Sequence, residues 1–269
     1  AWLTSIPGLA GTGILCQYQC SDVSEIPQTE CEALKALYDS TNGLDWINRD
    51  NWFGTTTPSD WYGVSVESGH VVGLFLSYNM LRGKLPAELG NLAALRELNL
   101  GHNQISGSIP PELGNLSSLT LLDMSSNMLS GGLPQELGNL PNLTTLYLQD
   151  NQLSSSIPGQ LGNLSSLTSL YLSSNSLSGN IPSELGNLTG LQFLDLGWNH
   201  LSGGIPPNLG NLTNLRLLYL GENQLSGSIP SELGGLENLL YLFLHGNQLT
   251  VSIPAALGDL AILKVLWLQ

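Results

Sequence analysis

The sequence predicts an α/β solenoid, a stack of short similar coils around one continuous core, and two regularities lead to this prediction. An asparagine returns every 24 positions, and a proline that follows Ile or Leu returns at the same interval. A fixed period with one apolar framework means that each unit packs only on its neighbours, so we expect function on the repeated surface. The two series are Asn79, Asn103, Asn127, Asn151, Asn175, Asn199, Asn223 and Asn247, and Pro86, Pro110, Pro134, Pro158, Pro182, Pro206, Pro230 and Pro254.

Each unit supplies one strand and one convex segment. In one copy Leu167, Leu170 and Leu172 alternate with other residues as in a strand, and Asn175 follows. We expect the leucines to fill the interior and the asparagine to hydrogen-bond backbone groups that the turn leaves unpaired. Proline lacks an amide donor, which suits a convex segment better than a central strand. We therefore divide the chain into a lead-in and cap, residues 1–70, and a solenoid of eight repeats plus the start of a ninth, residues 71–269.

Composition excludes two classes of partner. The chain of 269 residues has 21 acidic and 7 basic side chains, which give a formal net charge of −14. This charge repels phosphate backbones and anionic lipid head groups, so we expect no nucleic acid partner. Gly, Asn, Ser or Pro interrupts every apolar stretch, so we expect no membrane insertion in this segment.

The region before the repeats should cover the open end of the solenoid. Residues 1–28 show no clear period, and we expect an irregular or short-stranded lead-in there. A helix is predicted near residues 29–42, where Thr29 and Glu32 form a capping box and Gly43 is suited to a left-handed end.

Three tryptophans, Trp46, Trp52 and Trp61, lie just ahead of the first strand. They form either an aromatic binding site or a plug that shields the leucine core from water. Because solenoids need capped ends, the plug is the favoured interpretation.

Three cysteines, Cys16, Cys20 and Cys31, precede the repeats. This clustering is typical of a stapled terminal cap in an oxidising compartment, although three reduced thiols in a cytosolic protein are the alternative. Three pairings are open, and we favour Cys20 with Cys31, because that bond would pin the lead-in to the cap helix.

The pattern LxxLxLxxNxLxGxIPxxLGNL, seen from Leu95 to Leu116, resembles the plant-type leucine-rich repeat. The preceding ALKALYDSTNG, NW and DWYGV elements are similar to the cap of plant receptor ectodomains and of bacterial and algal secreted relatives. Cysteines around the DWYGV element are absent here, unlike in plant caps, which favours a non-plant member. The resemblance implies a right-handed superhelix with a concave parallel β-sheet and convex irregular or 3-10 segments. It also implies a secreted or cell-surface recognition protein.

The last residues begin a ninth strand with Leu263, Leu266 and Leu268, and no polar closing unit follows. An apolar edge is unfavourable in water. We therefore expect either a longer parent protein or self-association through this end.

The concave face carries the candidate binding site. Between the inward leucines, aromatic and acidic residues recur on the exposed side of the strands from the fourth to the eighth unit. Exposed aromatic clusters mark binding surfaces, and the carboxylates suit basic groups or sugar hydroxyls, so a protein, peptide or carbohydrate ligand is expected. The alternative is that aromatic residues merely fit strands well. The predicted ligand-binding residues are Tyr147, Tyr171, Phe193, Asp195, Trp198, Tyr219, Glu222, Tyr241 and Phe243.

A hydroxyl column suggests a different function, a structural or ice-associating surface. Serine or threonine recurs once per unit on the flank, but serine before glycine also satisfies local backbone groups. A thermal hysteresis measurement separates the two interpretations. The column is Ser106, Ser130, Ser154, Ser178, Ser202, Ser226 and Thr250, with Ser108, Ser156, Ser228 and Ser252 beside it.

Five sequons give glycosylation candidates in a eukaryotic secretory route, although most arise from the repeat consensus. They begin at Asn115, Asn142, Asn163, Asn187 and Asn211.

No catalytic arrangement appears. The histidines His70, His102, His200 and His245 lie in different units, and none is beside a nucleophile motif. No metal-ligand spacing or phosphate-binding glycine motif is found, so we expect neither an enzyme nor a cofactor.

Overall fold

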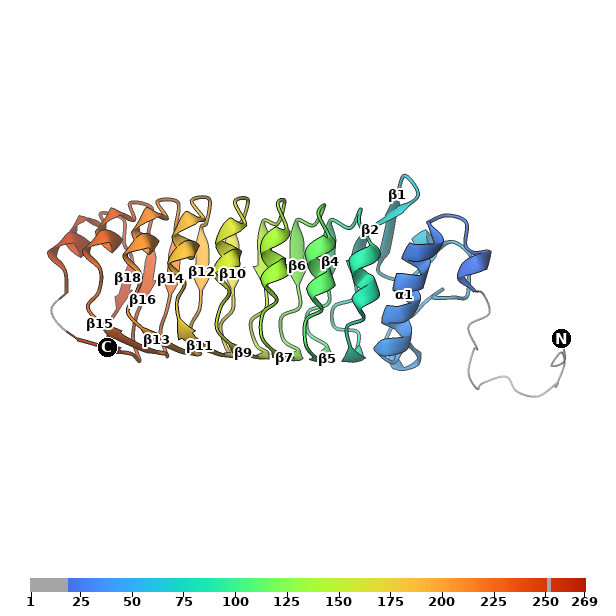
Figure 1. The fold of residues 1–269 in the computed structure, drawn as a ribbon, viewed down its shortest axis with the longest axis horizontal. Coiled ribbons are helices and arrows are strands. Elements are labelled where there is room, and N and C mark those ends of the chain that lie inside the picture. The colour runs from blue at the N-terminus through green and yellow to red at the C-terminus, as the bar shows by residue number, and fades with distance from the viewer. Residues whose placement is uncertain (1–18, 251–252) are drawn as a thin grey trace.

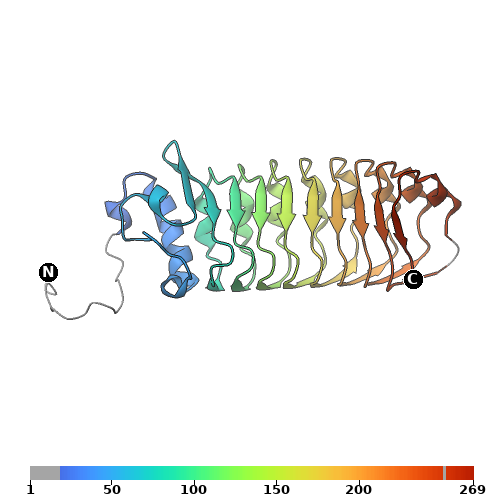
Figure 2. The ribbon, with the colours of Figure 1, turned by 180° about the vertical axis from the view of Figure 1, so that it is seen from behind.

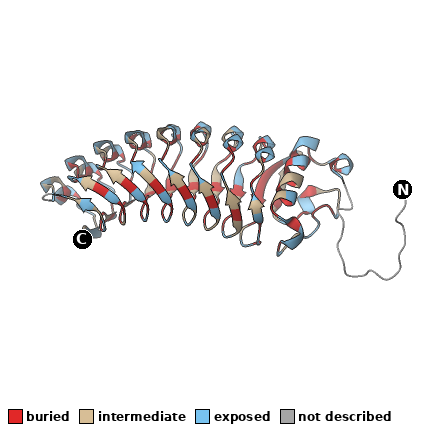
Figure 3. Cartoon of the chain, turned by 60° about the horizontal axis from the view of Figure 1, so that its bottom comes forward, coloured by how far each residue is buried: buried red, intermediate tan, exposed pale blue. Residues whose placement is uncertain are grey.

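The computed structural model describes residues 19–250 and 253–269, which form an elongated and gently bent stack of coils (Figures 1 and 3). The lead-in up to residue 18 and the hydroxyl of Ser252 lie outside the described residues. Each coil contributes a strand on one side, a 3-10 helix opposite, and a second short strand on the flank (Figure 1). The predicted solenoid is confirmed.

The first sheet lines the inner side of the bend (Figures 2 and 3). Within the described residues it has ten strands, of which β1 and β2 are antiparallel and all later neighbours are parallel. Each repeat strand except the last has a buried central leucine, whereas Leu266 in the last strand is 40% exposed. The strands are β1 (Val64–Glu67), β2 (His70–Phe75), β4 (Glu97–Asn99), β6 (Leu121–Asp123), β8 (Thr145–Tyr147), β10 (Ser169–Tyr171), β12 (Phe193–Asp195), β14 (Leu217–Tyr219), β16 (Tyr241–Phe243) and β18 (Val265–Trp267).

The opposite side is built from short 3-10 helices. In the repeats each helix begins directly after the recurrent proline, whose fixed φ and missing N–H suit a helix start. The expectation of a convex segment is confirmed. The helices are η1 (Cys20–Asp22), η2 (Gly43–Asp45) and η3 (Pro58–Asp60) in the cap, and η4 (Ala87–Asn91), η5 (Pro111–Asn115), η6 (Gln135–Asn139), η7 (Gly159–Asn163), η8 (Ser183–Asn187), η9 (Pro207–Asn211), η10 (Ser231–Gly235) and η11 (Ala255–Asp259) in the repeats.

A second parallel sheet runs along the flank, and the sequence interpretation missed it. The serines of the predicted hydroxyl column lie in these strands. Within the described part of the chain, the sheet has eight paired strands. They are β3 (Arg82–Lys84), β5 (Gln104–Gly107), β7 (Met128–Gly131), β9 (Gln152–Ser155), β11 (Ser176–Asn180), β13 (His200–Gly203), β15 (Gln224–Gly227) and β17 (Gln248–Leu249).

The recurrent asparagines, here called the ladder asparagines, join neighbouring coils as expected. The Asn175 Nδ2 donates to the carbonyl oxygens of Leu148 at 3.0 Å, Leu172 at 3.1 Å and Ser173 at 3.2 Å. Its Oδ1 accepts the Leu153 N–H at 2.9 Å. One buried amide therefore satisfies three backbone groups that the turns leave without partners, and it also contacts the Ser173 carbonyl, which accepts the Asp150 N–H at 3.0 Å.

The cap contains the predicted helix, α1 (Gln28–Ser40), but both of its ends differ from the expectation. The residue before it is Pro27 and no side chain caps it, so the Thr29 and Glu32 capping box is wrong. Proline already fixes the extended entry, which moves the start of the helix upstream of Thr29. At the other end Asn42, with φ 59°, takes the left-handed conformation expected of Gly43.

Gly43 is needed for a different reason, because a Cβ there would lie 2.3 Å from the ring of Tyr38. That ring belongs to an aromatic cluster with Trp46, Trp52 and Trp61, all buried. The three tryptophans thus form the plug, and the aromatic binding site proposed for them as an alternative is wrong.

A buried carboxylate fastens the cap to the first repeat strands. Glu30, only 4% exposed, accepts the backbone N–H of Val71 at 2.8 Å and contacts Nδ1 of His70 at 2.6 Å. Since both partners belong to β2, the Glu30 side chain links α1 to the first sheet.

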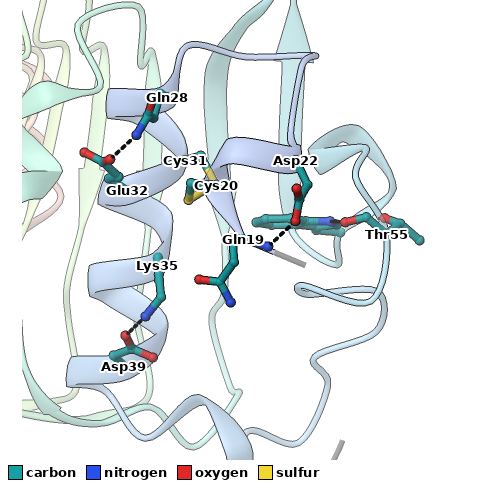
Figure 4. Close-up of a disulfide and its surroundings, with 10 residues drawn as sticks. Gln19, Cys20, Asp22, Gln28, Cys31, Glu32, Lys35, Asp39 and Thr55 are labelled. Carbon is teal, nitrogen blue, oxygen red and sulfur yellow. Dashed lines mark hydrogen bonds and ion pairs between the residues drawn. A yellow bond between two sulfur atoms is a disulfide. The ribbon is translucent and has the colours of Figure 1, made fainter. Parts of the chain in front are cut away.

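Cys20 and Cys31 form a disulfide, which ties η1 to the first turns of α1 (Figure 4). The favoured pairing is confirmed, while Cys16 lies outside the described residues. No helix in residues 19–250 and 253–269 has the length and apolar character that a membrane crossing requires.

Candidate functional site

The parallel register sets the aromatic and acidic residues of the inner sheet in one row. From β6 to β18, the last residue of each strand lies beside its counterpart in the next strand. Neighbouring members are therefore separated by one strand spacing, about 4.8 Å. The row, here called the central row, is Asp123, Tyr147, Tyr171, Asp195, Tyr219, Phe243 and Trp267.

The predicted binding residues all lie on this inner face, but most are half-buried instead of fully exposed. Trp198 is 56% exposed and Tyr241 is 36% exposed, whereas the remaining aromatic rings are partly covered by neighbouring strands. The covering arises because rings lean onto the preceding coil. A Cβ on Gly197 would lie 2.3 Å from the Tyr219 ring, and one on Gly221 would lie 2.6 Å from His245.

Two tyrosines occupy the middle of the central row. The rings of Tyr147 and Tyr171 meet edge to face, with centroids 5.1 Å apart. Burial raises the pKa of Tyr171, and the charges of Tyr147 and Asp195 add to this. The pair is bracketed by Asp123 on one side and Asp195 on the other.

Asp195 is the most perturbed carboxylate of this face. Its Oδ1 accepts the Gly197 N–H at 3.1 Å, and its Oδ2 accepts the Ser173 hydroxyl at 2.9 Å. Burial raises the pKa of Asp195, and the charge of Asp150 adds to this, whereas the two hydrogen bonds lower it. The carboxylate is therefore partly removed from water, with one hydrogen bond to each oxygen.

This environment gives a pH-dependent prediction for Asp195→Asn. The pKa of Asp195 is higher in the folded than in the unfolded state, so ionisation of this carboxyl lowers the stability of the fold. The stabilising contribution of the protonated carboxyl is present at low pH and is lost as pH rises through the folded-state pKa. We expect the variant to melt at a higher temperature than the parent protein at pH 7. The difference should vanish below the ordinary pKa of 3.8, where the carboxyl is neutral in both states.

Thermal melts between pH 3 and pH 8, roughly the range where carboxyls change charge, test this prediction. Asp259→Asn, an exposed site with the same change of charge, is the matched control. A gain for Asp195→Asn that stays constant down to acidic pH would contradict the assignment.

A second aromatic cluster lies toward β18, and it includes two residues that the sequence interpretation did not select. His245 is 5% exposed and stacks on Trp267 with ring centroids 3.8 Å apart. Tyr219 and Phe243 lie beside them at 4.9 Å from one another. Glu222 Oε1 is 3.9 Å from His245 Nε2. Trp267 is the last member of the central row. His245 stands where other units have serine, glycine or glutamine, and this departure from the repeat is the sequence signal that could have indicated it.

The residue before each ladder asparagine has a left-handed backbone, with φ 53° at Trp198 and 58° at Glu222. This conformation is unfavourable for residues other than glycine, and Trp198 gains little burial in return. More than half of its side chain is therefore open to solvent.

The flank hydroxyls form a less regular surface than expected. The serine column is only partly exposed, and the Ser106 hydroxyl donates to the Gly83 carbonyl at 3.1 Å. Exposed neighbours vary between Gln152, Met128 and His200.

The five sequon asparagines are all exposed, and glycosylation stays a prediction. Within the described residues no group of three His, Cys, Asp or Glu side chains could hold a metal ion.

Two family models match this chain. A leucine-rich repeat region is matched over residues 78–204, and single leucine-rich repeats over 214–236 and 238–260. The chain belongs to the leucine-rich repeat family. No curated protein gives a significant match.

Solved structures place this leucine-rich repeat protein beside plant receptor ectodomains. The GASSHO1/SCHENGEN3 ectodomain of Arabidopsis thaliana, in complex with CASPARIAN STRIP INTEGRITY FACTOR 2, is 39% identical to this chain, with a TM-score of 0.79. The match covers 88% of this chain and 29% of that ectodomain. The Arabidopsis HAESA ectodomain, in complex with an IDA peptide hormone, is 34% identical with TM-score 0.67 over 87% and 44%. The chain therefore spans less than half of either ectodomain.

Two further structures bear on the sequence interpretation. A leucine-rich repeat protein of Leptospira interrogans is 37% identical with TM-score 0.60 over 70% of this chain and 46% of its own. A plant ice-binding protein is 25% identical with TM-score 0.55 over 86% and 90%. The resemblance to plant receptors and to a bacterial protein is thus confirmed.

Proposed function

We propose that this leucine-rich repeat protein is an extracellular recognition module that binds a peptide segment along the central row. The observation that carries the proposal is the row itself, in which parallel register places Tyr147, Tyr171, Tyr219 and Phe243 beside carboxylates on one face. An extended peptide rises about 3.3 Å per residue and the coils are about 4.8 Å apart, so a peptide that lies across the strands can contact several coils in turn.

The comparisons support a peptide more than a glycan. The HAESA ectodomain is in complex with a peptide hormone, and the structural match to it covers 87% of this chain. The Cys20–Cys31 disulfide supports an oxidising, extracellular setting, secreted or at a cell surface. We therefore propose a protein or peptide ligand first, with carbohydrate as an outcome of the test.

The triple substitution of Tyr171, Tyr219 and Tyr241 with alanine tests the contact zone. Peptides selected from a random display library on the parent protein should bind the variant at least about 100-fold more weakly, because buried tyrosines at interfaces contribute about 2 kcal/mol each. Titration by fluorescence anisotropy measures this loss, and circular dichroism confirms that the variant is folded.

The control replaces three exposed glutamines of the second sheet, Gln152, Gln224 and Gln248, with alanine. It should bind like the parent protein. Peptide affinity that survives the tyrosine substitutions, or a glycan array that binds where peptides do not, would refute the peptide assignment.

Ice association is a second proposal, favoured by the serine that recurs in the flank strands from β5 to β15 and by the likeness to a plant ice-binding protein. Thermal hysteresis of the protein in solution decides it, and a value equal to that of buffer removes it.

A further inference from the structure

In the described part of the chain, none of the ion pairs involves a carboxylate beside the tyrosine pair. Among the described residues, ion pairs join Lys35 with Asp39, Arg96 with Glu67, and two histidines with glutamates. Asp123, Asp150 and Asp195 take part in none of them within this part of the chain.

Removal of an unpaired charge from water is energetically unfavourable, so a folded protein that keeps such a charge requires an explanation. Asp195 is in this position, since burial raises its pKa and the nearby Asp150 carboxylate opposes its ionisation further. Its hydrogen bonds from Gly197 and Ser173 use one lone pair on each oxygen and leave others free. A cation supplied from outside would satisfy the free lone pairs and offset both unfavourable contributions.

Aromatic rings stand on both sides of this carboxylate. In the central row Asp195 has Tyr171 as one neighbour and Tyr219 as the other, and Tyr171 is in turn packed against Tyr147. The negative faces of tyrosine rings attract cations, most strongly where water is excluded. Rings and carboxylate together form a cation subsite that neither would form alone.

We propose that Tyr147, Tyr171, Asp195 and Asp150 form a subsite for the guanidinium group of an arginine side chain in a bound peptide. This inference rests on the proposed function and names the ligand chemistry that the same face selects. A guanidinium fits better than an ammonium, because its flat fork donates two hydrogen bonds to one carboxylate while its plane stacks on a ring.

A small probe tests the subsite without a known ligand. N-acetyl-argininamide is titrated into the full chain labelled with ¹³C-aspartate, and the Asp195 carboxyl signal is assigned by its loss in Asp195→Asn. The expected dissociation constant is on the order of 1–10 mM, as for a single weak contact. Saturation should lower the pKa of Asp195, because a neighbouring cation favours the ionised form.

N-acetyl-citrullinamide is the matched probe, with the same shape and no charge, and N-acetyl-lysinamide tests the guanidinium assignment. Citrullinamide should leave the Asp195 pKa unchanged, and lysinamide should act more weakly than argininamide. An equal response to argininamide and citrullinamide, or no response to argininamide, overturns the cation subsite. Equal responses to argininamide and lysinamide overturn the choice of arginine.

The peptides selected on the parent protein provide the second measurement. Those that carry arginine should lose about 10- to 100-fold in affinity for Asp195→Asn, as when one partner of a charged hydrogen bond is removed. Replacement of that arginine by citrulline should remove the dependence on Asp195. Glu112→Gln, at an exposed position of η5 and with the same change of charge, should bind normally.

The two proposals fail in different ways. Peptides that need the tyrosines but bind Asp195→Asn like the parent protein overturn the subsite and leave the peptide function intact. If no peptide is selected, the proposed function fails, and the small-probe titration still decides whether the arginine subsite exists.

Discussion

Gly162→Ala is expected to destabilise the protein by about 3 kcal/mol, as overpacking of a tight core does. Gly162 lies in η7, at the place where this helix approaches the next coil. A Cβ there would lie 2.3 Å from the carbonyl oxygen of Glu184 and 2.7 Å from its carbonyl carbon. Backbone atoms cannot rotate away as a side chain can, so the two coils must separate. Urea denaturation followed by circular dichroism measures the effect.

The chain provides its own control, because Gly258 occupies the same place in the last described unit. No atom lies within 4 Å of a Cβ built on it. Gly258→Ala should therefore change stability by no more than about 0.5 kcal/mol. Equal losses in the two variants would show that the backbone of this helix, and not the distance between coils, requires glycine.

The buried framework could be predicted from the sequence because it depends on period alone. Leu170 and Asn175 recur with their neighbours at fixed intervals, and each recurrence occupies the same place in its coil. The second sheet was missed because β11 and its neighbours have few large apolar residues, so Ser178 and Gly179 were interpreted as a hydroxyl surface. The start of α1 was misplaced because a capping box at Thr29 and the upstream Pro27 compete as signals.

The repeat period predicts which residues lie together on the proposed binding face, but it does not predict how far each of them is buried. Whether Tyr219 is exposed depends on the residue beneath it, Gly197, which belongs to the preceding coil and lets the ring lie flat. The same holds for His245 over Gly221. Such contacts join different columns of adjacent units, so a column-by-column interpretation of the sequence does not reveal them. The hydrogen bond that Asp195 accepts from Ser173, a residue of the preceding coil, is another contact of this kind.

Replacement of one ladder asparagine should have the largest effect on stability. Asn199 is 5% exposed, and its Nδ2 donates to the carbonyl oxygens of Leu172 at 3.0 Å, Leu196 at 3.2 Å and Gly197 at 3.0 Å. Its Oδ1 accepts the Leu177 N–H at 2.9 Å. Asn199→Ala leaves the Leu172 and Leu196 carbonyl oxygens and the Leu177 N–H without this partner, whereas the Gly197 carbonyl still accepts the Ser174 N–H. We expect a loss of about 3–5 kcal/mol in the free energy of unfolding.

Asn208→Ala, an exposed position in η9, is the control and should stay within about 0.5 kcal/mol of the parent protein. Amide hydrogen exchange adds a local test, because the Leu177 N–H should exchange faster in Asn199→Ala than in Asn208→Ala. Asn199→Asp separates the roles of the two amide atoms, since it keeps the acceptor for Leu177 but places a carboxylate against three carbonyl oxygens. If Asn199→Ala were as stable as Asn208→Ala, the leucine packing alone would hold the coils together and the asparagine ladder would be dispensable.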